Sequence, residues 1–214
     1  MSNLPFVKSN TGDSSSFLGY KQCKIYEFVD ESNESFASWS NIFLTIILNV
    51  KGSSYERKMS VKGTWEHDDN GNVVDCALLR KIHRLLDAIG CNDIGINVKG
   101  NWQNLQGDII EDIGTYLSDK YASNPVDESF PYVAYIYKKT PRPGKTKVYT
   151  EVYPYLIKDE EEQVNTLKEH IEWCRKNGNL KEYNPNTVEE PETEEEENVD
   201  PPFDTSDLNL PDSL

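Results

Sequence analysis

Residues 40–51 read Ser-Asn-Ile-Phe-Leu-Thr-Ile-Ile-Leu-Asn-Val-Lys, and apolar side chains occupy every second position from Ile42 to Val50. This alternation, rich in β-branched residues, is typical of a strand with one face in a core. A Gly-Ser-Ser turn follows at residues 52–54, and the alternation resumes over residues 55–63. The sequence therefore predicts a β-hairpin here and a mainly β fold.

Further strands and helices are expected around this hairpin. Strand patterns cover residues 22–29, 132–139 and 147–157, and helical spacing of apolar side chains covers residues 75–89, 108–117 and 159–176. Asp75 and Gly90 suit the two ends of the first helix, whereas Gly114 interrupts the second one. Asp159 with Glu162 resembles a capping box at the start of the last helix.

The charge of the chain is divided unevenly along its length. The 214 residues include 37 acidic and 22 basic side chains, which gives a formal charge of −15. Eleven of the acids lie in residues 188–214, which hold neither Lys nor Arg, so the rest of the chain is close to balanced. Such a segment cannot bury enough apolar area to offset the entropy cost of ordering, and we expect it to be disordered.

Four regions follow from these patterns. Residues 1–16 are polar and are expected to form a flexible N-terminus. Residues 17–158 are expected to form one domain, mainly β with added helices, which is an ordinary size for a single core. A C-terminal amphipathic helix in residues 159–178 is expected to pack on this domain. Residues 179–214 are expected to form a disordered acidic tail.

Little in the sequence points to catalysis, a metal or a membrane. The four cysteines, Cys23, Cys76, Cys91 and Cys174, show no Cys-x-x-Cys spacing and are expected to be buried thiols. His170 and Cys174 are four residues apart on a helix, but the two further ligands of a zinc site are lacking. The sequence shows no nucleophile motif, signal peptide or membrane-spanning apolar run. We expect a cytoplasmic protein without enzymatic activity, metal or cofactor.

The late hairpin concentrates aromatic and basic residues. Between Tyr132 and Lys158, six Lys or Arg side chains stand against Glu151 alone. The even positions of its strands are apolar: Ala134, Ile136, Val148, Val152 and Leu156. The odd positions hold tyrosine and lysine: Tyr135, Tyr137, Lys139, Lys147, Tyr149, Tyr153 and Tyr155. Because side chains alternate between the faces of a sheet, we expect one core face and one exposed face of tyrosine and lysine.

An exposed face of this kind suits single-stranded nucleic acid, because bases stack on aromatic rings while lysines contact phosphates. The predicted interface comprises Tyr135, Tyr137, Lys138, Lys139, Arg142, Lys145, Lys147, Tyr149 and Tyr153, extended by Arg57, Lys58, Lys62 and Trp65 of the early hairpin. The alternative interpretation is that the tyrosines fill a second core layer under the helices, with their hydroxyls at its rim.

The order of these elements resembles that of bacteriophage single-stranded DNA-binding proteins. The resemblance rests on the strands at 40–51 and 55–63, the helix at 75–90, the late hairpin of tyrosine and lysine, and the acidic C-terminus. It implies an OB-fold-like small β-barrel that coats transient single strands in DNA replication, recombination and repair.

The resemblance also implies that the tail recruits replication or recombination proteins. The residues that would do so are Asp200, Phe203, Asp204, Asp207, Leu208, Leu210, Asp212 and Leu214. Tails of this class often finish with an aromatic residue, whereas this chain ends on Leu214 and has Phe203 as the only aromatic residue of residues 188–214. The predicted partners are thus single-stranded DNA and these proteins, with no membrane, and further copies of the chain are candidates as well.

Two other functions are compatible with the sequence. The acidic tail would suit a protein-interaction factor or DNA mimic that occupies host or phage DNA-binding proteins. A metal-dependent nuclease on the same barrel is the other, but the sequence lacks the carboxylate cluster that such an enzyme needs.

Overall fold

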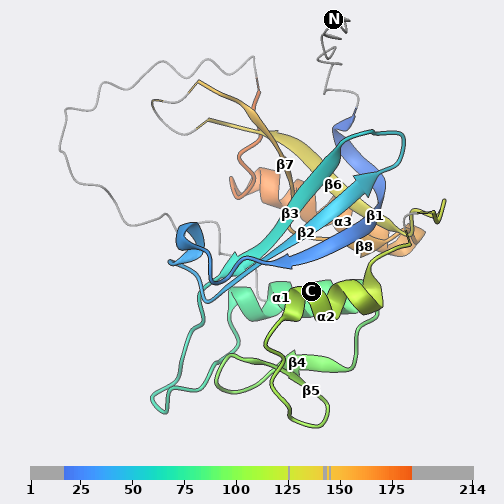
Figure 1. Ribbon diagram of the computed structural model, residues 1–214. Coiled ribbons are helices and arrows are strands. Elements are labelled where there is room, and N and C mark those ends of the chain that lie inside the picture. The colour runs from blue at the N-terminus through green and yellow to red at the C-terminus, as the bar shows by residue number, and fades with distance from the viewer. Residues whose placement is uncertain (1–16, 125, 142–143, 145, 185–214) are drawn as a thin grey trace, which may run out of the picture.

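The computed structural model describes residues 17–124, 126–141, 144 and 146–184. The flexible segment predicted for residues 1–16 and residues 185–214 of the predicted tail lie outside the described residues, as do Arg142 and Lys145. Disorder is wrong for residues 179–184, because Glu182 pairs with Lys139 at the end of β6 (Tyr132–Lys139) and Leu180 is buried. The described chain folds around one curved sheet, with helices against both of its faces (Figure 1).

Six strands form the main sheet. They are β1 (Gly19–Asp30), β2 (Ile42–Val50), β3 (Glu56–Gly63), β6 (Tyr132–Lys139), β7 (Tyr149–Val152) and β8 (Ile157–Lys158). Their order is β3-β2-β1-β6-β7, with β8 also on β6, and every pairing is antiparallel. In the β2–β3 hairpin Thr45 lies opposite Ser60, so the early hairpin and the mainly β class are confirmed.

The sheet curves round without closing. Its two end strands, β3 and β7, run in the same direction because four antiparallel pairings separate them, and they lie side by side without forming a ladder. The barrel expected from the sequence is therefore an open sheet with a seam between β3 and β7.

The strand expected over residues 147–157 is divided into β7 and β8. The Tyr153 amide still donates to the Tyr135 carbonyl of β6 at 2.8 Å, residues 154–156 leave the sheet, and the Tyr155 amide donates to the Tyr153 carbonyl at 2.7 Å. Pro154 has no N–H with which to continue the ladder, which explains the break.

The first core lies between the inner face of the sheet and two helices, α1 (Ala77–Ile89) and α2 (Ile113–Tyr121). The alternate residues of β2 from Ile42 to Val50 point into this core, as their period of two predicts. Helix α1 ends at Gly90 in the left-handed conformation (φ 71°), as expected. Its N-cap position is Cys76, however, and Asp75 forms an ion pair with Arg80 at 2.8 Å instead of capping.

Helix α2 begins five residues later than its pattern suggests. The Asp112 carboxylate accepts a hydrogen bond from the Thr115 amide at 2.9 Å and so caps the helix start. Gly114 does not interrupt this helix. A Cβ at that position would lie 2.7 Å from the Asp30 backbone nitrogen, so glycine is the residue that lets α2 lie against β1.

Three short elements have no clear signal in the sequence. A 3-10 turn, η2 (Ser35–Ala37), lies in the β1–β2 connection, and β4 (Ile94–Ile96) pairs with β5 (Trp102–Asn104) in a separate hairpin. Three residues are too few to show an alternation, which is why these two strands were not predicted.

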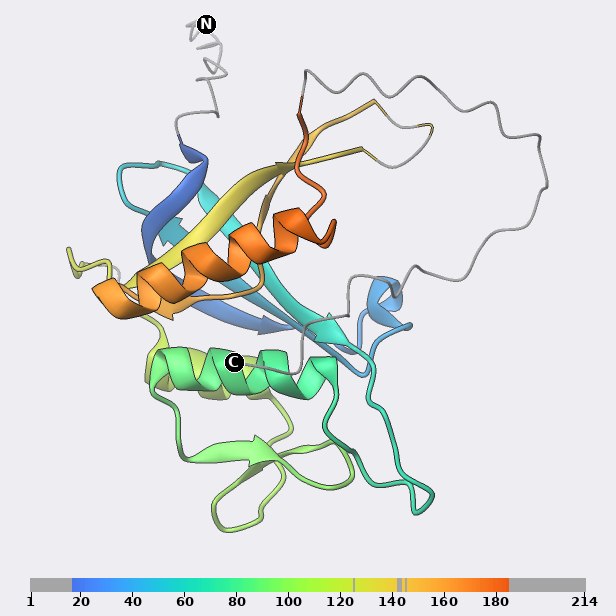
Figure 2. The same cartoon turned by 180° about the vertical axis from the view of Figure 1, so that it is seen from behind.

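Helix α3 (Glu161–Lys176) covers the opposite face of the sheet, where it lies across β6 (Figure 2). Its buried residues Leu167, Ile171 and Cys174 pack with Tyr135 and Tyr137 in a second core. The helix predicted to pack on the domain is therefore confirmed. Its capping box is wrong, because the N-cap is Glu160 and the Asp159 carboxylate accepts from the Gln22 side chain instead.

Within the described ranges no helix has the length and apolar character needed to cross a membrane.

Candidate functional site

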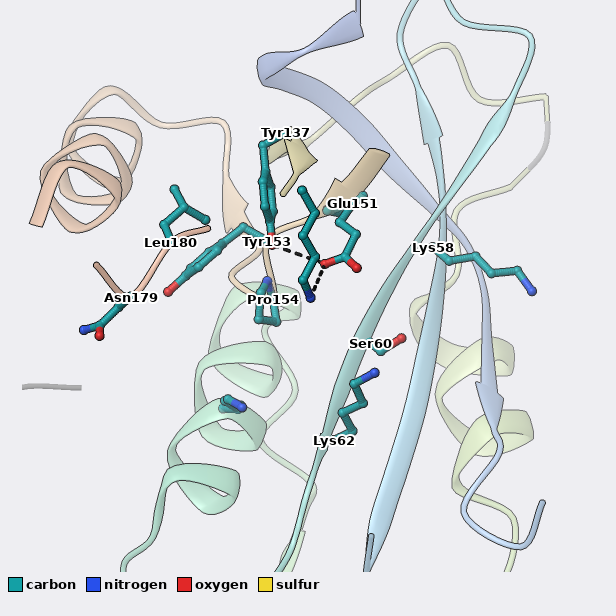
Figure 3. A pocket seen from close by; sticks show the side chains of 12 residues that line it. Lys58, Ser60, Lys62, Tyr137, Glu151, Tyr153, Pro154, Asn179 and Leu180 are labelled. Carbon is teal, nitrogen blue, oxygen red and sulfur yellow. Dashed lines mark hydrogen bonds and ion pairs between the residues drawn. The ribbon is translucent and has the colours of Figure 1, made fainter. Parts of the chain in front are cut away.

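A groove of about 360 Å³ lies along the seam between β3 and β7 (Figure 3). Four lysines from three elements line it: Lys58 and Lys62 of β3, Lys81 of α1 and Lys139 of β6. Among the described residues that line the groove, Glu151 of β7 is the single carboxylate. The lining is therefore strongly basic, although the chain as a whole is acidic.

The β3 lysines reach the groove because of strand alternation. Met59 and Val61 point into the first core, and Lys58, Ser60 and Lys62 consequently point to the other face. Lys58 and Lys62 are exposed, as expected from their position opposite to Met59 and Val61. The charged ends of these side chains therefore lie at the surface, where a ligand can reach them.

Glu151 is already engaged within the groove. Its Oε2 atom accepts from the Tyr137 hydroxyl and from Lys139 Nζ, each at 3.2 Å. The carboxylate thus offsets the charge of one lysine, and the lining keeps a net positive charge. Such a surface attracts an anionic ligand and is screened by salt.

Tyr153 forms part of the groove wall, and its hydroxyl is bound to α3. The hydroxyl lies 3.1 Å from His170 Nε2 and 3.3 Å from Cys174 Sγ. Burial raises the pKa of Tyr153, while burial and the charge of Arg84 lower the pKa of His170 to about 4. The imidazole is therefore neutral at pH 7, and Tyr153 is a half-buried structural link between the groove and α3.

Tyr135 and Tyr137 do not form an exposed stacking face. Their side chains are only 4% and 8% exposed, because α3 covers this side of β6. The Tyr135 hydroxyl is hydrogen-bonded to Glu182 and Arg175, and burial raises its pKa. The predicted stacking role is wrong for these two rings, and the second-core interpretation of the sequence is the correct one for them.

The remaining predicted residues lie apart from one another. Tyr149 is 56% exposed near the β6–β7 loop, with Lys147 Nζ 5.1 Å from its ring centre. Lys138 lines a separate hollow beside Tyr183. Trp65 is buried in the first core, so its predicted contact with a ligand is wrong.

Arg57 shares the inward parity of Met59 on β3, and its Nε atom is buried without a hydrogen-bond partner within the described part of the chain. The groove thus brings together five of the predicted residues, Lys58, Lys62, Tyr137, Lys139 and Tyr153, from two hairpins that are distant in sequence.

The sequence interpretation missed two features of this site. Lys81 belongs to the polar side of α1, and only the packing of that helix beside the seam brings it to the groove. Phe36 and Trp39 lie in the β1–β2 connection, and their rings pack edge-on against Phe43. The ring centres are 5.4 Å apart for Phe36 and 6.3 Å apart for Trp39. In the sequence, Phe36 and Trp39 are recognisable only as two aromatic residues within a short polar loop.

Throughout the described ranges, no three His, Cys, Asp or Glu side chains are grouped so that they could hold a metal ion. The four cysteines are free and buried, as expected, and burial raises the pKa of Cys23 to about 12. Thiols of this kind are inert.

No protein-family model matches this chain, and no curated protein or solved structure is significantly similar to it. The resemblance to phage single-stranded DNA-binding proteins therefore stays a prediction. Any function has to be inferred from the groove and its own residues.

Proposed function

We propose that this chain is a non-enzymatic protein that binds single-stranded DNA without sequence preference, through the lysine groove between β3 and β7. The observation that carries the proposal is the convergence of Lys58, Lys62, Lys81 and Lys139 on one groove of a chain whose net charge is −15. Lysines contact phosphates and do not distinguish bases, so this lining favours binding that tolerates any sequence.

The strand order supports relating the domain to the OB fold. An OB fold is a partly open, five-stranded Greek-key barrel that binds oligonucleotides on its second and third strands and adjoining loops. Here the order β3-β2-β1-β6-β7, with α1 after the third strand and β3 parallel to β7, fits that arrangement. The groove includes the outward residues of β3, the third strand in this scheme.

We place the protein in replication, recombination or repair, where it would coat transient single strands. The acidic residues 188–214 would recruit protein partners, with Phe203 and the aspartates around it as the candidate contacts. The charge of this segment suits basic surfaces on such partners.

A titration of the full chain with fluorescently labelled oligo-dT at several salt concentrations tests the proposal. Four phosphate contacts predict that the logarithm of the binding constant falls with the logarithm of salt concentration with a slope of about −3, since each contact on a single strand contributes about −0.7. An absence of binding at low salt, both for the full chain and for residues 1–187, would overturn it.

A further inference from the structure

A cluster of three aromatic rings lies beside the groove. Phe36 and Trp39 belong to the β1–β2 connection, around the short η2 turn, and both rings contact Phe43 of β2. We call these three residues the aromatic platform. It is formed by residues close in sequence and lies at the end of the β2–β3 hairpin where Phe43 is paired with Lys62.

The rings of the platform are exposed to different degrees. Phe43 is 8% exposed and forms its base, whereas Phe36 is 55% and Trp39 38% exposed. Two of the other tryptophans, Trp65 and Trp102, are buried in the first core. Large exposed aromatic side chains that are held against one another are typical of binding surfaces.

Lys62 connects the platform with the groove. Its Nζ atom lies 4.7 Å from the ring centre of Phe43, and the same side chain lines the groove. Lys62 is therefore the point at which Phe43, the base of the platform, meets the lysines of β3. A surface with aromatic rings beside positive charges suits a single strand, because bases stack on rings while phosphates contact lysines.

The acids of the same connection do not contradict this arrangement. Glu31 accepts a hydrogen bond from the Thr45 hydroxyl, and Asp30 accepts from the Ser32 amide at 3.0 Å, so both act within the turn. Glu34 is exposed and disfavours a phosphate at this end of the surface. The platform thus suits the uncharged part of a nucleotide, while the phosphates lie toward Lys62 and Lys58.

We infer that Phe36 and Trp39 are the base-stacking subsite of this protein, so that a single strand passes from the platform across β3 into the lysine groove. This inference rests on the proposed function. It adds a contact for the bases of the ligand, which the lysines of the groove do not recognise. It also replaces the buried tyrosines of β6 as the source of base stacking.

Two probes separate the subsite from the groove: labelled oligo-dT, and a deoxyribose-phosphate strand of the same length without bases. The Phe36→Ala/Trp39→Ala variant should bind oligo-dT about tenfold or more weakly, because each stacked base contributes roughly 1–3 kcal/mol. Its binding to the abasic strand should be unchanged. Leu105→Ala, at a 72% exposed position next to β5, is a control in which both affinities should be retained.

Trp39 provides a second measurement that does not depend on affinity. Oligo-dT should quench the tryptophan emission of the wild-type chain, and Trp39→Phe should abolish most of this quenching while retaining binding, since phenylalanine also stacks. Quenching that persists in Trp39→Phe would overturn the inference.

The outcomes distinguish failure of the inference from failure of the proposed function. If the platform variant binds oligo-dT as tightly as the wild type, the subsite is wrong and groove binding stands. If the wild type binds neither probe, the proposed function itself is wrong. Two results together would also overturn the inference. The first is that deletion of residues 187–214 changes the fluorescence of Trp39 in the absence of DNA. The second is that Phe36→Ala/Trp39→Ala in the truncated chain leaves the oligo-dT affinity unchanged. The occupant would then be the chain's own tail.

Discussion

The two basic hairpins of this protein have similar compositions and opposite environments. In β3 apolar residues alternate with Lys58, Ser60 and Lys62, and in β6 they alternate with tyrosine and lysine; both strands have one face in the first core. The outer face of β3 is open and lines the groove, whereas the outer face of β6 is covered by α3 except near its end, where Lys139 also lines the groove. Alternation therefore shows which residues share a face, but the packing of a distant helix decides whether that face can bind a ligand.

The largest expected effect concerns the β6–β7 hairpin, which we call the covered hairpin because α3 packs on β6. Tyr135→Ala should lower the free energy of unfolding by about 3–4 kcal/mol, because it removes a buried ring and leaves a cavity under α3. The oligo-dT affinity of the folded protein should change less than threefold. Chemical denaturation followed by circular dichroism measures the first quantity, and anisotropy titration the second.

Two matched variants sharpen this result. Tyr135→Phe keeps the ring and loses only the hydroxyl contacts with Arg175 and Glu182, so it should cost about 1 kcal/mol. Tyr149→Ala, at an exposed position of the same hairpin, should leave stability within about 0.5 kcal/mol. A Tyr135→Ala protein that is stable but binds weakly would show that α3 does not cover this face.

Variants of the β2–β3 hairpin, which we call the open hairpin, should change the affinity for DNA rather than the free energy of unfolding. Lys58→Glu/Lys62→Glu reverses two charges on the groove and should weaken oligo-dT binding about 100-fold at low salt. The salt slope should become shallower by about 1.4, at about 0.7 for each lost phosphate contact. Salt-dependent titration measures both quantities.

The control for this variant is Lys168→Glu/Lys176→Glu on α3. Both lysines are exposed, and the change in net charge is identical, so the control separates a local effect from a general repulsion of DNA. It should change affinity less than threefold. Equal losses in the two variants would contradict a specific role for the groove.

The free energy of unfolding is expected to depend on pH through His170, which lies where the covered hairpin packs against α3. His170 has a pKa of about 4 when folded, lowered by burial and by Arg84, against about 6.5 when unfolded. The unfolded chain therefore binds the extra proton first, and stability is lost as pH falls from about 6.5 towards 4. At pH 5 the loss attributable to His170 is about 2 kcal/mol.

The contribution of His170 appears as a difference between two proteins. The free energy of unfolding of the wild type, minus that of His170→Phe, should decrease between pH 7.5 and pH 5. Leu105→Ala, at an exposed position without a titratable group, should show the wild-type pH profile. A constant difference between the wild type and His170→Phe would mean that His170 titrates normally.

The sequence predicted what depends on local alternation. The run from Ile42 to Val50 is readable because one face of β2 is buried, and the same reasoning placed Lys58 and Lys62 on the outside of β3. The even positions Ala134 and Ile136 were likewise assigned correctly to the first core.

What depends on contacts between distant segments was not predictable. Tyr135 fits either a solvated face or a core, because tyrosine has a large apolar ring and a polar end. The apolar stripe of α3 was recognised, but its destination on β6 was not. The meeting of Lys139 with Lys62 across the seam, and the position of Lys81, depend on the curvature of the whole sheet.

The smallest expected effect concerns competition between the acidic segment, residues 188–214, and DNA for the lysines of the groove. Asn179 and Leu180, shortly after α3, line the groove, and the eleven acids of residues 188–214 follow them in the sequence. A tethered anion has an effective concentration in the millimolar range and competes with a phosphate ligand. Deletion of residues 187–214 should therefore tighten oligo-dT binding several-fold at low salt.

A full-length variant with the seven glutamates of residues 189–197 replaced by glutamine separates charge from length. If competition is electrostatic, this variant should approach the affinity of the truncated chain, and the difference from wild type should shrink as salt is added. An affinity equal to the wild type in both variants would leave the segment with partner recruitment as its only proposed role. The salt dependence of binding would then arise from the lysines of the groove without a contribution from the tail.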